Sequence, residues 1–130
     1  MRFVPALMIA CLAAPVLGQD LGSGERNFAI HCAGCHGEDA KGGGIASMIL
    51  DGEAPDLTKL AERNGGVFPR AAVVFQIDGR DPLPGHAGEM PQFGPLFEGE
   101  TAALKTAAGQ PVVTSKAIVE LVEWLEARQE

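Results

Sequence analysis

The stretch HCAGCHGEDAKGGG, residues 31–44, places two cysteines and a histidine within five consecutive positions and follows them with glycines. The spacing Cys32-x-x-Cys35-His36 is typical of three kinds of site: a redox-active disulfide, a metal site and a covalent haem attachment site. Because residues three and four positions apart share a face of a helix, both thiols and the imidazole are expected to project to one side. The rest of the chain decides between these chemistries.

The beginning of the chain is typical of an export signal. A single positive charge at Arg2 precedes an almost wholly apolar run from Phe3 to Leu17. This run is shorter than the roughly 20 apolar residues that span a bilayer. We therefore predict that residues 1–18 are a cleaved signal peptide and that residues 19–130 form one periplasmic domain.

The composition of the predicted mature chain excludes one class of partner and raises a question about its core. Nine Lys and Arg side chains remain beside 17 Asp and Glu, which gives a net charge of −8. Nucleic acid is not an expected partner, because binding to phosphates needs a basic face. The same chain has five phenylalanines, one tryptophan and no tyrosine. A small domain this poor in large side chains needs something else to fill its core.

Helix signals recur along the chain. A first helix is predicted over 23–35, with Ser23 as its N-cap, and a short one from the cap Asp56 to about residue 63. A further helix is predicted from Pro69, in the first helical position, to near Gly79.

The last helix has the clearest apolar stripe. Thr114 or Ser115 is its expected N-cap, and Trp124 lies beside the stripe. The stripe itself consists of Ile118, Leu121, Val122 and Leu125.

The segments between these helices are predicted to be loops. Residues 37–55 are rich in glycine, and residues 80–111 carry five of the nine prolines. At most a turn or two of helix is expected around residues 101–107. Since no alternating strand pattern is present, the predicted fold class is all-α.

The three chemistries of the cysteine motif make different demands on this architecture. A thiol oxidoreductase uses a helix N-terminus to lower the pKa of its first thiol and sits in a fold with strands, whereas these cysteines lie at the predicted end of a helix. A structural zinc ion needs four ligands, and beyond the motif only His31 and His86 are available. We therefore favour covalent attachment of haem through Cys32 and Cys35, with His36 as a ligand of the iron.

The second axial ligand of the iron is predicted to be Met90. It stands in GEMPQFG, a proline-rich segment that can fold over the distal face, and Pro91 restricts its backbone. Met48 is an alternative, but its apolar neighbours favour a core-filling role. His86, four residues before Met90, is the alternative ligand if Met90 does not bind.

Five motifs follow one another in a set order along the chain: Gly24-x-x-x-Phe28, Cys32-x-x-Cys35-His36-Gly37, Pro55 in APDLT, Met90-Pro91 and Leu121-x-x-Trp124. With this set the sequence resembles the class I (monohaem) cytochromes c. The resemblance implies a small cytochrome c fold, in which three to five helices wrap around one covalently bound haem c with its iron. It implies that the N- and C-terminal helices cross closely, and Gly24 suits such a crossing because it has no side chain. It also implies that the carbonyl of Pro55 accepts a hydrogen bond from Nδ1 of His36.

The predicted function follows from the ligands. Iron held by His36 and Met90 has no open position for a substrate, so we predict an electron-transfer protein and not an enzyme. The expectation is a soluble, exported carrier that cycles the haem iron between Fe(III) and Fe(II). The alternative is a gas-binding or gas-sensing haem protein with a labile sixth ligand.

The predicted partners are other redox proteins. The negative net charge favours docking on basic surfaces, and a membrane is contacted only through a membrane-bound redox partner. Within the site, three side chains are candidates for contact with the haem propionates: Arg70, Gln76 and Arg80.

Overall fold

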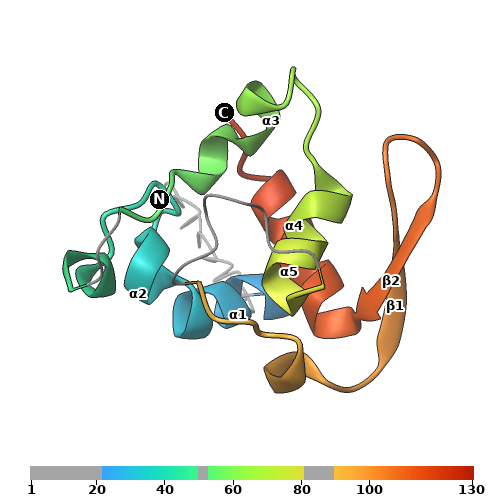
Figure 1. Cartoon of the computed structure of the whole chain (residues 1–130), viewed down its shortest axis with the longest axis horizontal. Helices are drawn as coiled ribbons and strands as arrows, with labels where there is room; N and C mark the ends of the chain where they lie inside the picture. Colours follow the sequence, from blue (N-terminus) through green and yellow to red (C-terminus); the bar gives the residue numbers. More distant parts are fainter. Residues whose placement is uncertain (1–21, 50–52, 81–89) are drawn as a thin grey trace, which may run out of the picture.

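A computed structural model describes residues 22–49, 53–80 and 90–130 of the chain. The predicted signal peptide at residues 1–18 and the alternative ligand His86 lie outside the described residues. In chain order (Figure 1) the elements are α1 (Ser23–His31), α2 (Ala33–His36), η1 (Ile45–Met48), η2 (Leu57–Lys59), α3 (Leu60–Arg63), α4 (Arg70–Asp78), η3 (Pro95–Phe97), β1 (Thr101–Lys105), β2 (Pro111–Ser115) and α5 (Lys116–Glu126), where η marks a 3-10 helix. None of the helices described is both long enough and apolar enough to cross a bilayer.

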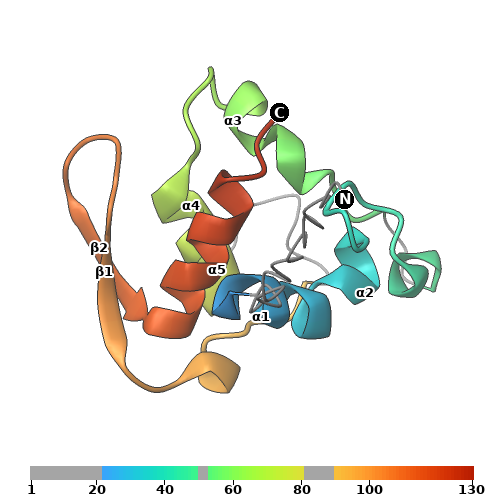
Figure 2. The same cartoon turned by 180° about the vertical axis from the view of Figure 1, so that it is seen from behind.

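The first and last helices pack directly on each other, as the resemblance implied. Gly24 of α1 lies so close to α5 that a Cβ atom there would collide with the carbonyl oxygen of Glu120 and lie 2.9 Å from Cβ of Trp124. One turn later the ring of Phe28 stacks on Trp124, with ring centroids 4.6 Å apart. Figure 2 shows α1 lying across α5. This contact between α1 and α5 is therefore central to the fold.

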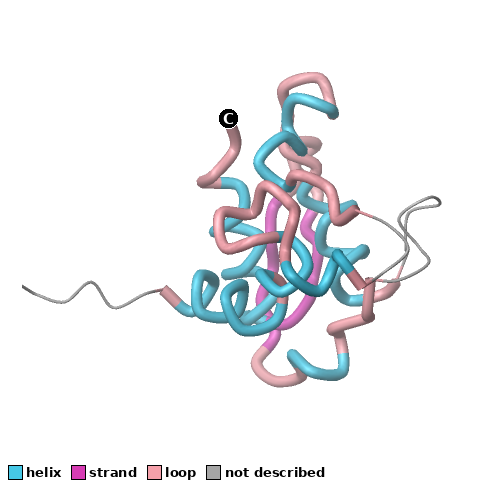
Figure 3. Tube along the Cα trace, turned by 90° about the vertical axis from the view of Figure 1, so that its left-hand side faces the viewer, coloured by secondary structure: helices cyan, strands magenta, loops and turns pink. Residues whose placement is uncertain are grey.

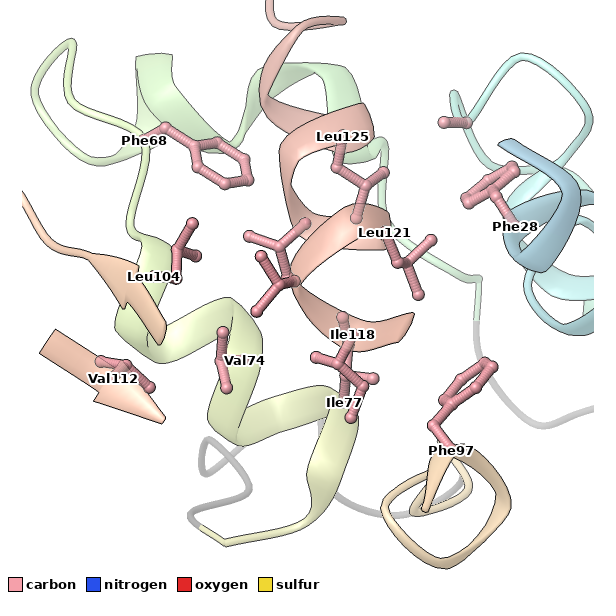
Figure 4. Packing of buried hydrophobic residues seen from close by; sticks show 13 residues of the cluster. Phe28, Phe68, Val74, Ile77, Phe97, Leu104, Val112, Ile118, Leu121 and Leu125 are labelled. Atoms are coloured by element: carbon pink, nitrogen blue, oxygen red, sulfur yellow. The ribbon is translucent and has the colours of Figure 1, made fainter. Parts of the chain in front are cut away.

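The predicted stripe of α5 forms the middle of the hydrophobic core (Figure 4). Ile118, Leu121, Val122 and Leu125 are all buried. The helix begins where Ser115 accepts a hydrogen bond from the backbone N–H of Ile118, at 3.3 Å. The side chains packed around this stripe come from several other elements: Phe28, Phe68, Val74, Ile77, Phe97, Leu104 and Val112.

The helices that precede α5 in the chain begin and end close to the predicted positions, with two differences in the first of them. Asp56 caps η2 by accepting a hydrogen bond from the N–H of Thr58 at 2.8 Å, and α4 ends at Gly79, whose φ is 84°. The predicted helix over 23–35 is instead two helices, because the backbone bends at Cys32, with φ −117° and ψ −37°. The predicted cap Ser23 is wrong: its hydroxyl hydrogen-bonds to the Glu120 carboxylate and so joins α1 to α5.

The all-α prediction is wrong for residues 101–115, where the chain forms an antiparallel hairpin. Figure 3 shows the two strands side by side, and Leu104 pairs with Val112 in their register. These two side chains are buried at 3% and 8% exposure, while their strand neighbours Ala103 and Val113 face solvent. The hairpin is stable because this one apolar face packs on the core, and the predicted helical turn around 101–107 does not form.

Candidate functional site

The two cysteines of the motif lie where α1 meets α2. Cys32 joins the two helices and Cys35 stands in α2; within the described chain both thiols are free and partly buried. Burial, with a smaller contribution from Cys35, raises the pKa of the Cys32 thiol to about 11. A redox-active thiol works as a thiolate and therefore needs a lowered pKa. The structure thus provides the opposite of what a thiol–disulfide oxidoreductase requires.

His36, the last residue of α2, is held in a defined orientation. Its Nδ1 lies 3.3 Å from the carbonyl oxygen of Pro55. A carbonyl only accepts hydrogen bonds, so Nδ1 carries the proton and the lone pair of Nε2 is free for a metal. Burial lowers the pKa of His36, and the hydrogen bond to Pro55 opposes this only in part. The neutral ring, which is the form that binds metals, is therefore favoured.

The glycine-rich loop explains how Pro55 reaches His36. Gly42, in the left-handed region at φ 91°, donates its N–H to the carbonyl of His36 at 2.7 Å. A Cβ atom at Gly42 would lie 2.7 Å from the carbonyl oxygen of Ala54. The loop is thus clamped between α2 and the Pro55 segment, and a larger residue at this position would push the two apart.

Met90 stands on a separate segment of the chain and lies next to α4. Its partly buried side chain packs against the core, and its Sδ lies 3.6 Å from Nε2 of Gln76. Just beyond it, the N–H of Phe93 donates to the carbonyl of Ile77 at 2.8 Å. The segment just after Met90 is therefore hydrogen-bonded to α4, while His36 is the last residue of α2.

The other predicted site residues are distributed differently. Met48 does not fill the core, as its side chain on η1 is 81% exposed. Arg70 pairs with Glu126 of α5 at 2.7 Å. Arg80 pairs with Asp78 at 2.6 Å and donates to the carbonyl of Val113 at 2.9 Å. Contact between these arginines and a propionate stays a prediction.

Among the described residues, no group of three or more His, Cys, Asp and Glu side chains has the arrangement to hold a metal ion by itself. The zinc interpretation of the cysteine motif therefore finds no ligand set in this part of the chain, since a structural zinc ion needs four such ligands.

Comparison with known proteins gives one finding. Residues 19–109 match the family described as cytochrome c oxidase, cbb3-type, subunit III. The chain belongs to this family of c-type cytochromes. No curated protein and no solved structure matches the cytochrome. Membership confirms the resemblance to monohaem cytochromes c: the cytochrome carries covalently bound haem c with its iron, and haem-based electron transfer is its class of function.

The side chains that could bind haem c in this cytochrome fit that cofactor. Two free thiols three residues apart, an adjacent neutral imidazole and a thioether on a separate segment are the donors that c-type haem uses. Sequence reasoning missed one contact in the set: Gln76, a candidate for contact with a propionate, lies at the sulfur of Met90. Fourteen positions separate the two residues, and this spacing gives no signal of contact, because only the path of the intervening chain decides it.

Proposed function

We propose that this cytochrome is a soluble, exported electron carrier whose iron is ligated by His36 and Met90 and whose haem is attached through Cys32 and Cys35. The observation that carries the proposal is the orientation of His36. Its Nδ1 hydrogen-bonds to the carbonyl of Pro55, beside two free thiols, so Nε2 is left free to bind a metal.

Haem c supplies a one-electron Fe(III)/Fe(II) couple when bound. The chain's own residues keep the coordination constant. Pro55 fixes the ring of His36, and two thioether bonds at Cys32 and Cys35 would prevent loss of the group. Met90 would occupy the position on the iron that a gas or a substrate would otherwise take.

The proposed partners are redox proteins with basic docking surfaces, because the chain has a net charge of −7. The matched family is named after a subunit of an oxidase. A membrane-bound redox protein is accordingly the partner class that we propose, with the periplasm as the compartment on the strength of residues 1–18.

This proposal is tested by absorption spectra of the protein after it has been expressed from its complete sequence, with residues 1–18 included, and isolated from the periplasmic fraction. We expect haem bands that survive acid extraction, a sulfur-to-iron charge-transfer band in the oxidised protein, and no spectral change when carbon monoxide is added to the reduced protein at neutral pH. Rapid binding of carbon monoxide would contradict a stable sixth ligand and favour gas binding. Recovery of the protein only from the cytoplasm would contradict export.

Two methionine variants make the ligand assignment specific. Met90→Ala opens the sixth position, so we expect loss of the charge-transfer band and rapid binding of carbon monoxide. Met48→Ala, a matched control on exposed η1, should keep the wild-type spectrum. The reverse pattern would assign the ligand to Met48.

A further inference from the structure

The side chain of Gln76 makes a contact that the proposed function does not use. Gln76 lies in α4, and its Nε2 is 3.6 Å from Sδ of Met90. A carboxamide nitrogen only donates and a thioether sulfur only accepts, so the hydrogen bond runs from Gln76 to Met90. The sulfur has two lone pairs, and accepting this bond with one leaves the other for a metal.

We propose that Gln76 is a positioning residue for the sixth ligand, which orients the thioether of Met90 and raises the reduction potential of the cytochrome. The inference rests on the proposed function, in which Met90 ligates the iron. A hydrogen bond to the sulfur withdraws electron density from it and makes it a weaker donor. Fe(III) is stabilised by electron donation more than Fe(II) is. The weaker donor therefore stabilises the reduced state relative to the oxidised state, which raises the reduction potential.

The chain just after Met90 is held to α4 by contacts that do not involve the side chain of Gln76. Phe93 is hydrogen-bonded to Ile77 in α4 at 2.8 Å. Next to it, Gly94 lies so close to α4 that a Cβ atom there would be 2.6 Å from the carbonyl oxygen of Asp78. The loop is thus held to α4 by main-chain contacts on its C-terminal side. These main-chain contacts do not depend on the Gln76 amide, so they remain when it is removed.

The test compares the same substitution at two glutamines. Gln76→Leu removes the donor at similar volume, whereas Gln92→Leu changes an exposed side chain that lies against Gly79. For Gln76→Leu we expect the Fe(II)/Fe(III) ratio at a fixed potential to fall several-fold, up to about tenfold, which corresponds to ~59 mV for one electron. We also expect a shifted charge-transfer band and a thermal midpoint close to that of the wild type.

Gln92→Leu should keep the wild-type potential and band. Equal potentials for the wild type and both variants would overturn the proposal. A charge-transfer band absent from the wild-type protein would instead show that the proposed ligation by Met90 has failed, so the two failures are distinguishable.

A measurement on the unsubstituted protein does not depend on the folding of any variant. In NMR spectra of the reduced, diamagnetic cytochrome, we expect a nuclear Overhauser effect between the side-chain amide protons of Gln76 and the methyl protons of Met90. Its absence, with both groups assigned, would overturn the contact on which the proposal depends.

Discussion

At the scale of single residues, Cys32 and Cys35 matter for stability as well as for attachment of the group. The aromatic side chains in the described core, such as Phe28 and Phe68, are few, and η1 exposes its apolar side chains instead of burying them. A chain of this size with so little aromatic surface gains limited stability from burial. A large apolar group bonded to α2 would supply what the side chains lack.

We therefore predict that the double variant Cys32→Ala, Cys35→Ala does not reach a stable fold. Without thioether bonds the haem is not retained, so the core loses its largest apolar component. Far-ultraviolet circular dichroism during heating should show no cooperative transition, in contrast to the wild type. Cys11→Ala is the matched control, because this cysteine lies in the predicted signal peptide and should leave the mature protein unchanged. A cooperative transition in the haem-free double variant would contradict the prediction.

Two contacts at the proposed site show what the sequence can and cannot predict at this scale. The contact of His36 with Pro55 was implied by an ordered set of motifs, because the motif and the proline stand at a recognisable place in that order. The contact of Gln76 with Met90 was not implied by any motif, because a glutamine in a helix has no motif of its own. Met48 was wrongly predicted in the core because an apolar run indicates burial only when the segment has a surface to pack against.

At the scale of elements, the hairpin is the part of the fold that sequence analysis missed. Each strand has five residues and one buried apolar side chain, Leu104 in β1 and Val112 in β2. An alternation this short cannot be told from a loop. The pairing is instead fixed by tertiary contacts, including the hydrogen bond from Arg80 to Val113 at 2.9 Å. By contrast, the stripe of α5 extends over about two turns and was predicted correctly.

The contact between α1 and α5 gives a prediction at this scale. Gly24→Ala introduces a Cβ atom that collides with the backbone of α5 at Glu120, and neither helix can yield without separating from the other. We expect the free energy of unfolding to fall by about 2–3 kcal/mol, which lowers the melting temperature by roughly 10 °C for a domain of this size. Thermal denaturation of the holoprotein provides the measurement.

Gly22→Ala is the control for this substitution. Its Cβ atom would meet nothing within 4 Å, and its φ of −51° suits alanine. The expected loss is at most about 1 kcal/mol, from a poorer N-cap. Equal destabilisation by the two variants would show that the close approach of the helices is not what Gly24 provides.

At the scale of the whole molecule, the net negative charge gives the protein a negative electrostatic potential at its surface. Many of the described basic side chains lie within ion-pair distance of a carboxylate: Lys41, Lys59, Arg70, Arg80, Lys116 and Arg128. Their charges are therefore neutralised locally. Carboxylates on the exposed residues Glu38, Glu53 and Glu123 add to the net charge of −7, so a reagent that approaches the protein meets an acidic surface.

We predict that the rate of electron transfer depends on salt with a sign set by the charge of the reagent. Oxidation of the reduced cytochrome by a cationic complex such as tris(1,10-phenanthroline)cobalt(III) should slow as ionic strength rises, because salt screens the attraction over a Debye length of about 10 Å at 0.1 M. Oxidation by ferricyanide should accelerate over the same range, because salt screens a repulsion. Stopped-flow absorbance of the haem bands measures both rates. The variant Glu38→Lys, Glu53→Lys should reduce both slopes, and slopes of the same sign for the two reagents would show that the net charge does not control the approach.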